Sequence, residues 1–199
     1  MRIKGLDKEL APIVIGTSSA LFTDETTPWI PTNLSKEEQF AAKNGMDGFR
    51  AISPHYSLAH QINDPWGGGV SITGPEHAED RKFLEENVIP VFAYSSMSGG
   101  FISGMFKSND REAAEKFLTP PAKKGYYAEE NFERLARAEQ LAEKYNVSVA
   151  QISMAWLFNQ PLKVIPLQGG EKANMYAQTL EASKMKLTAD EVKWLNLED

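Results

Sequence analysis

The stretch Val88-Ile-Pro-Val-Phe-Ala-Tyr94 leads directly into Ser95-Ser-Met-Ser-Gly-Gly100, so that a short apolar run ends in a turn of small residues. An apolar run without polar alternation is typical of a strand that is buried on both faces of a sheet. A second run of this kind, Lys163-Val-Ile-Pro-Leu167, ends at Gly169-Gly170. Because doubly buried strands occur mainly in parallel sheets covered by helices, the two runs predict an α/β fold.

Two more apolar runs lie nearer the start of the chain. Ala11–Ser19 and Gly48–Ser53 each predict a strand, the second one stopped by Pro54. Residues 20–34 between them are rich in Thr and Pro and keep no regular period, which predicts a loop. Ser35-Lys-Glu-Glu38 has the form of a capping box and predicts a helix that ends near Gly45.

Helical signals separate the later strands. A charged segment over 75–87 and a polar one over 109–118 predict helices, and a longer helix is predicted after Pro120-Pro121. Its apolar stripe consists of Phe132, Leu135, Ala138, Leu141 and Tyr145. Capping boxes at Ser148–Gln151 and Thr188–Glu191 begin two further helices. Strands that alternate with helices predict a parallel sheet with right-handed crossovers.

Composition narrows the class of protein. The 199 residues are 42% hydrophobic, which is sufficient for one folded domain, and the net charge of −6 argues against nucleic acid and anionic membranes as partners. No cysteine is present, which excludes disulfides, a thiolate nucleophile and zinc sites with sulfur ligands. No long apolar run and no secretion signal are found, so we expect a cytoplasmic protein. No other residue pattern indicates a metal site.

Three motifs, taken together and in order, resemble the second half of the aldo-keto reductases, which are NAD(P)-dependent enzymes with a (β/α)8 barrel. Val91–Gly104 is similar to the family's seventh strand and its glycine-containing loop. Gln151–Gln160 resembles the helix before the eighth strand. Val164–Lys172, with Leu180-Glu-Ala182 and Leu187-Thr188 beyond it, resembles the eighth strand and the terminal helix.

The resemblance also indicates that part of the barrel is missing. Residues 1–19 resemble the first strand, 20–44 form an irregular junction, and 45–199 correspond to the second half of the barrel, all in a single domain. No segment matches the strands that carry the family's catalytic Asp, Tyr, Lys and His. Since a whole barrel needs about 250 residues, the expected fold is an incomplete (β/α)8 TIM-type barrel, with parallel strands and alternating helices.

The resemblance implies a cofactor site for NADP or NAD after the seventh strand. Tyr94 would stack on the nicotinamide, and backbone groups of Ser95, Ser96, Met97 and Gly99 would line the pyrophosphate, where small residues permit a close approach. The alternative is that Tyr94 covers the end of a core strand and that the residues after it form an ordinary turn.

The loop after the eighth strand would hold the adenosine end of the cofactor. By resemblance Gly169, Gly170 and Lys172 belong to this loop, and Gln178 offers an amide to the adenine. Glu171 places a carboxylate where a 2′-phosphate would lie, so the choice between NADP and NAD stays open.

The implied activity is the NAD(P)H-dependent reduction of a small aldehyde or ketone. No proton donor is assigned, because no tyrosine lies in the family's catalytic motif. The alternative is a catalytically inactive remnant that acts as a dinucleotide-binding or oligomerisation module. Because missing strands expose the edges of a sheet, we expect a homo-oligomer.

Two other features allow a functional and a structural interpretation. His55 follows Pro54 at a strand end and either polarises a carbonyl or is a structural histidine with satisfied hydrogen bonds. Asp64-Pro-Trp-Gly-Gly-Gly69 forms either a mobile lid or a flexible connection with Trp66 folded onto the core.

Overall fold

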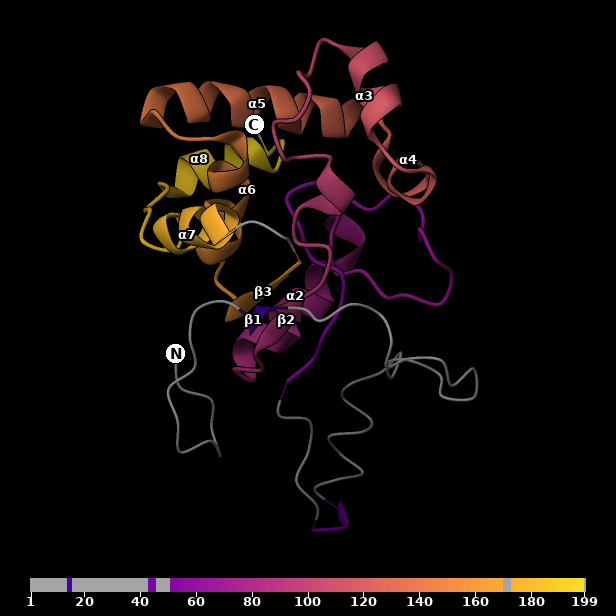
Figure 1. Ribbon diagram of the computed structural model, residues 1–199. Coiled ribbons are helices and arrows are strands. Elements are labelled where there is room, and N and C mark those ends of the chain that lie inside the picture. The colour runs from indigo at the N-terminus through magenta and orange to yellow at the C-terminus, as the bar shows by residue number, and fades with distance from the viewer. Residues whose placement is uncertain (1–13, 16–42, 46–50, 170–172, 199) are drawn as a thin grey trace.

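The computed structural model describes residues 14–15, 43–45, 51–169 and 173–198. The predictions for the loop at 20–34, the start of the following helix, Gly170 and Lys172 lie outside the described residues. Strands β1 (Val14–Ile15), β2 (Val91–Ala93) and β3 (Val164–Gln168) form a parallel sheet in the order β1-β3-β2. The first described strand therefore lies beside the last one (Figure 1). The predicted α/β class and the parallel pairing are confirmed.

Helices follow the predicted alternation and gather largely above the sheet in Figure 1. They comprise α2 (Ala78–Glu86), α3 (Arg111–Phe117), α4 (Pro120–Tyr126), α5 (Glu129–Tyr145), α6 (Val149–Phe158), α7 (Ala173–Ala182) and α8 (Ala189–Leu195), with 3-10 helices at Pro75–His77 and Ser98–Gly100. Among the described ranges, no helix is both long and apolar enough to span a membrane.

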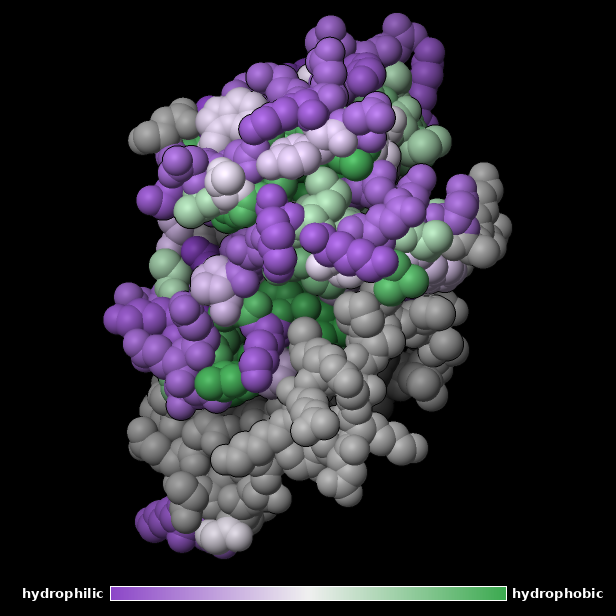
Figure 2. Space-filling model, turned by 90° about the vertical axis from the view of Figure 1, so that its left-hand side faces the viewer, coloured by the Kyte–Doolittle hydropathy of each residue, from purple (hydrophilic) through white to green (hydrophobic). Residues whose placement is uncertain are grey.

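The hydrophobic core lies between the sheet and the helices. Helix α6 packs on β3, α5 and α7, which explains why most of its residues are buried. Outside the grey residues, the face drawn in Figure 2 is largely hydrophilic, with smaller hydrophobic patches between the purple regions. The two predicted capping boxes that lie in the described residues are confirmed, because the Ser148 and Thr188 side chains accept hydrogen bonds from the backbone N–H groups of Gln151 and Glu191.

The predicted strand at 48–53 is not a continuous strand in its described part. Residues 51–55 run parallel to β2 but pair with it only through isolated bridges. Pro54 has no N–H to donate to the Phe92 carbonyl, and the Ser53 hydroxyl donates to that oxygen instead, at 2.8 Å. The proline therefore interrupts the ladder while the side chain of its neighbour satisfies the acceptor.

The outer edge of segment 51–55 is paired with residues 70–72, which were not predicted to lie there. The His55 N–H donates to the Val70 carbonyl at 2.8 Å, and the Ile72 N–H donates to the His55 carbonyl at 3.0 Å. A loop thus covers part of an edge that was expected to be open. The homo-oligomer stays a prediction. This part of the edge does not need a second chain to satisfy its backbone groups.

Strand β2 begins at Val91 and not at Val88 as predicted. The Val88 N–H donates to the Glu85 carbonyl at 3.1 Å, which ends α2. Its side chain is 56% exposed, and its φ of 56° lies in the left-handed region. Because a β-branched residue is strained in that region, Val88 is an unfavourable choice at this position.

Replacing Val88 with glycine is therefore expected to stabilise the protein. Glycine adopts a positive φ without strain, and the exposed valine buries little surface, so the free energy of unfolding should rise by about 0.5–1 kcal/mol. Urea denaturation of the two proteins measures the difference. The control is Glu86→Gly at the end of α2, which should destabilise by a similar amount. A loss of stability in both variants would contradict the interpretation.

The long helix predicted after Pro120-Pro121 is in fact two helices, α4 and α5. Thr119 caps α4, and Pro120 occupies the first position of this helix. Proline is tolerated there because the N–H group that it lacks would have no acceptor within the helix. The chain then becomes extended at Ala128, with φ of −144°, before α5 begins. The predicted stripe is buried from Phe132 to Leu141, whereas Tyr145 is only partly buried.

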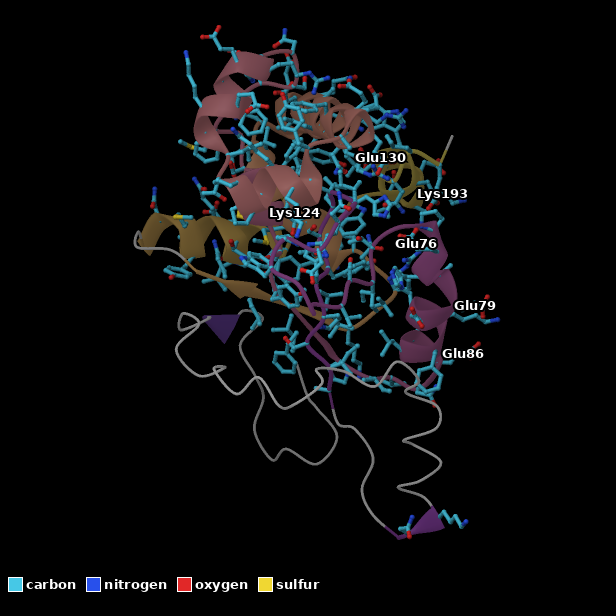
Figure 3. The ribbon with its side chains drawn as sticks, turned by 90° about the vertical axis from the view of Figure 1, so that its right-hand side faces the viewer. Glu76, Glu79, Glu86, Lys124, Glu130 and Lys193 are labelled. Atoms are coloured by element: carbon cyan, nitrogen blue, oxygen red, sulfur yellow. The ribbon has the colours of Figure 1, made fainter. Side chains whose placement is uncertain are left out.

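Residues 56–62 are fixed to α5 by two side chains. His60 keeps only 17% of its side chain accessible, and its ring nitrogens lie 2.9 Å from Glu76 and 2.7 Å from Glu130. Figure 3 shows these two glutamates on neighbouring elements, while Glu79 and Glu86 extend away from α2. Asn131, which is fully buried, exchanges hydrogen bonds with the His60 backbone.

Candidate functional site

The two loops predicted to hold a cofactor lie at the same edge of the sheet. Because β2 and β3 are parallel neighbours, Tyr94 after β2 and Gly169 after β3 emerge at the same end. The Ser96 hydroxyl donates to the Leu167 carbonyl at 3.0 Å and so joins the turn after β2 to β3. In parallel α/β sheets, ligands bind outside the carboxyl ends of the strands.

The turn after β2 has an unusual backbone. Ser95, Ser98, Gly99 and Gly100 all have positive φ, from 47° to 93°. Within the described part of the chain, the N–H groups of Ser95, Ser96 and Met97 have no hydrogen-bond acceptor. Successive backbone N–H groups beside left-handed residues form concave anion-binding sites. The turn therefore offers three donors at the carboxyl end of β2.

Gly99 also has a structural reason to be a glycine, whether or not a cofactor approaches it. Its φ is 60°, and a Cβ at this position would lie 3.0 Å from the Ala122 Cβ of α4. The absence of a side chain thus allows the turn to pack against α4. Close approach of a pyrophosphate is not needed to explain this glycine.

Tyr94 lies at the end of β2 with its ring partly accessible. Its hydroxyl donates to the Val70 carbonyl at 3.3 Å, and burial together with the nearby Asp64 carboxylate raises its pKa to about 12. Its ring centroid lies 5.8 Å from that of His55 and 6.4 Å from that of Trp66. Tyr94 is thus a neutral aromatic platform at neutral pH.

The loop at 64–69 is anchored beside Tyr94. The Asp64 carboxylate accepts hydrogen bonds from the N–H groups of Trp66 at 3.0 Å and Gly69 at 2.7 Å. Burial acts to raise the pKa of Asp64, but these donors outweigh it and lower the pKa. Trp66 is 60% exposed, so the expectation that it folds onto the core is wrong.

His55 belongs to a buried network of hydroxyl groups. Its Nδ1 lies 3.0 Å from the Ser71 Oγ, and its Nε2 lies 3.1 Å from the Ser57 Oγ. Ser71 in turn pairs with Thr73 at 2.7 Å. Ser57 donates to the Ala59 carbonyl at 2.9 Å, and it accepts from the Ser98 hydroxyl at 2.9 Å.

Counting hydrogens assigns the protonation state of this network. Since the only Ser57 hydroxyl hydrogen goes to the Ala59 carbonyl, the His55 Nε2 must donate to Ser57, and in a neutral ring Nδ1 then accepts from Ser71. His55 is fully buried, and burial lowers its pKa to about 3. The neutral ring is thus satisfied on both sides, which favours the structural interpretation of His55.

The predicted adenosine end is described only in part. Met97 and Gln178 line the same small cavity, of about 30 Å³, together with Gln168 and Thr179. This volume corresponds to about one water molecule, so a dinucleotide has to lie along these loops and not inside them. Gly169 is exposed and has no neighbouring atom where a Cβ would be.

A larger cleft of about 410 Å³ lies away from Tyr94, between residues 56–60, the start of α2, α5 and the end of α8. Its arginines are already engaged, since Arg81 donates to the carbonyls of Ile72 and Gly74, and Arg134 lies 3.5 Å from Glu130. Size alone therefore does not make this cleft the functional site.

No proton donor emerges among the tyrosines with shifted pKa values. Burial raises the pKa of Tyr56 and of Tyr126, as it does for Tyr94, so none of the three has the lowered pKa that would make it a stronger acid than a free tyrosine. Within the described ranges, no group of three His, Asp or Glu side chains is arranged to hold a metal ion.

Fold and site together define an α/β protein with two loops, a ring platform and backbone donors at one edge of a parallel sheet. A profile of the Aldo/keto reductase family matches residues 73–196, which include β2, β3 and both loops. The chain belongs to the aldo/keto reductase family.

Individual relatives agree with this assignment. The aldo-keto reductase yakc of Schizosaccharomyces pombe, whose name specifies NADP(+), is 30% identical over 116 residues, 56% of this chain and 33% of the relative. An aryl-alcohol dehydrogenase of Pestalotiopsis microspora is 26% identical over 83% of this chain and 37% of the relative. Aldo-keto reductase YhdN of Bacillus subtilis is 26% identical over 76% and 44%, respectively. The chain spans less than half the length of each of these relatives.

Proposed function

We propose that the chain binds NADP or NAD at the carboxyl edge of β2 and β3 and acts as an oxidoreductase on a small aldehyde or ketone. The observation that carries the proposal is the group of three N–H donors, of Ser95, Ser96 and Met97, which have no acceptor among the described residues and lie next to the Tyr94 ring. A ring for the nicotinamide and donors for the pyrophosphate are the two features that the dinucleotide requires.

The sheet order supports a related proposal for the fold. If β1, residues 51–55, β2 and β3 correspond to the first, sixth, seventh and eighth strands of the family's barrel, then β3 must lie between β1 and β2, with 51–55 beyond β2. This is the order of the described strands and bridges. We propose on this basis that they form a continuous sector of an incomplete barrel.

Each residue has a defined part in the proposed site. The nicotinamide would rest on Tyr94, the pyrophosphate would accept hydrogen bonds from the turn, and Gln178, with Lys172 beyond the described residues, would contact the adenosine end. The cofactor, when bound, supplies the hydride. No group that would protonate the carbonyl oxygen is assigned, and the alternative of an inactive remnant has no separate support in the described residues.

Titration with NADPH and NADH tests the binding proposal. We expect saturable changes in nicotinamide emission and in tryptophan fluorescence, since Trp66 lies beside Tyr94. Tyr94→Ala should weaken binding about tenfold through loss of the aromatic contact, whereas Tyr94→Phe keeps the ring and should bind within about twofold of the wild type. No binding at millimolar cofactor by the folded protein would overturn the proposal.

Activity needs a separate measurement. If the chain binds NADPH, its oxidation in the presence of aldehydes and ketones is followed by absorbance, with Tyr94→Ala as the matched control for background oxidation. Binding without turnover would leave only the dinucleotide-binding part of the proposal.

A further inference from the structure

Three contacts hold the turn after β2 against the rest of the molecule. Ser96 is bonded to the β3 carbonyl of Leu167, and Gly99 packs on α4. The third contact is the hydrogen bond from the Ser98 hydroxyl to the Ser57 hydroxyl, at 2.9 Å. Both of these serines are essentially inaccessible to solvent, so water cannot replace this bond.

The Ser98 tether acts at one of the two residues of the turn that carry a Cβ and have positive φ, the other being Ser95. Ser98 has φ of 55°, and Gly99 and Gly100 continue the left-handed backbone. A residue with a Cβ is rarely stable in this region without a compensating contact. The Ser98 side chain makes such a contact through its hydrogen bond to Ser57. Ser98 directly follows the three residues whose N–H groups are the donors.

His55 determines how Ser57 presents its oxygen. The Ser57 Oγ accepts from both His55 and Ser98 and donates to the Ala59 carbonyl, so its donor and both of its acceptor positions are in use. With His55 in place, the Ser57 hydroxyl has a single satisfied orientation, in which a lone pair points at Ser98.

We infer that Ser57 and His55 are positioning residues for the turn at 95–100: they fix Ser98 and thereby hold the N–H groups of Ser95, Ser96 and Met97 in place for the cofactor pyrophosphate. This inference rests on the proposed function. According to this inference, the buried network around His55 and Ser57 fixes the geometry of the binding turn that follows β2.

Two variants and one control test the inference. Ser57→Ala removes the acceptor of the tether, and Ser98→Gly removes its donor while permitting the positive φ, so at least one of them should fold. Ser153→Ala is the matched control, because the Ser153 hydroxyl is also buried but has no hydrogen-bond partner among the residues that the structure describes. Deuterium uptake of the segment at 95–101 is measured without cofactor, and the dissociation constant for NADPH is measured separately.

In both tether variants we expect uptake in this segment to increase about two- to tenfold and NADPH binding to weaken by a similar factor, with Ser153→Ala unchanged. Uptake and affinity that match the control in a folded tether variant would overturn the inference. The two proposals fail separately. A wild-type protein that does not bind NADPH removes the proposed function while the uptake data still decide whether the tether positions the turn.

Discussion

Replacing Asn131 with leucine is expected to lower the free energy of unfolding by about 4 kcal/mol, the largest effect of any single change considered. Asn131 is fully buried in α5. Its Oδ1 accepts from the His60 N–H at 2.8 Å, and its Nδ2 donates to the carbonyls of His60 at 2.8 Å and Tyr126 at 2.9 Å. Leucine has a similar volume but leaves these three backbone groups without partners.

The loss of stability in Asn131→Leu is large because the unpaired groups are buried, and not only because three hydrogen bonds are removed. A polar group that loses its partner away from water costs about 1–3 kcal/mol, because neither water nor another side chain replaces the bond. Asn87→Leu is the control, since the Asn87 side chain bonds one carbonyl at the exposed end of α2 and should lose about 0.5 kcal/mol. Chemical denaturation measures both variants. Equal losses in the two would show that the amide of Asn131 does not anchor residues 56–62.

Acidification is expected to destabilise the protein through His55, by about 2 kcal/mol between pH 7 and pH 5. The folded state keeps the ring neutral, with a pKa lowered to about 3, whereas the unfolded chain takes up a proton near the ordinary value of 6.5. Below pH 6.5 the unfolded state therefore binds more protons and is favoured. The His55 contribution is complete above about pH 7 and is lost progressively as the pH falls toward 3.

Comparison with His55→Gln isolates this contribution. Glutamine retains a donor toward Ser57 but does not titrate, so the variant should be less stable at pH 7 and should lose less stability on acidification. The other ionisable groups are the same in both proteins, so their effects cancel in the difference. Urea denaturation at several pH values provides the slopes. Parallel slopes would mean that His55 is protonated in the folded state or accessible to solvent.

Much of the fold was predictable because local signals are strong in this chain. Continuous apolar runs indicated β2 and β3, and the capping boxes at Ser148 and Thr188 marked the starts of α6 and α8. Less was predictable where one residue changes the backbone. The left-handed Val88 delayed β2, and Ala128 separated α4 from α5.

The candidate site likewise has features that the sequence predicts and features that it does not. The motif after β2 indicated Tyr94 and the turn, and the resemblance to aldo-keto reductases indicated their use. The pairing of Ser57 with Ser98 and of Asn131 with His60 joins residues 41 and 71 positions apart, respectively. No local pattern carries such contacts. Serine in a turn and asparagine in a helix are ordinary residues, so the sequence alone does not mark these four residues as partners.

By itself, the sequence determined the α/β class, the family and the order of strands and helices, because these depend on apolar periodicity, capping residues and motifs that each occupy a few neighbouring positions. Only the tertiary structure decided which N–H groups after β2 have no acceptor in the described part of the chain, how Gly99 packs on α4 and why burial keeps His55 neutral. These properties depend on burial and on atoms brought together from distant parts of the chain, where the loss of water makes each unpaired or charged group decisive.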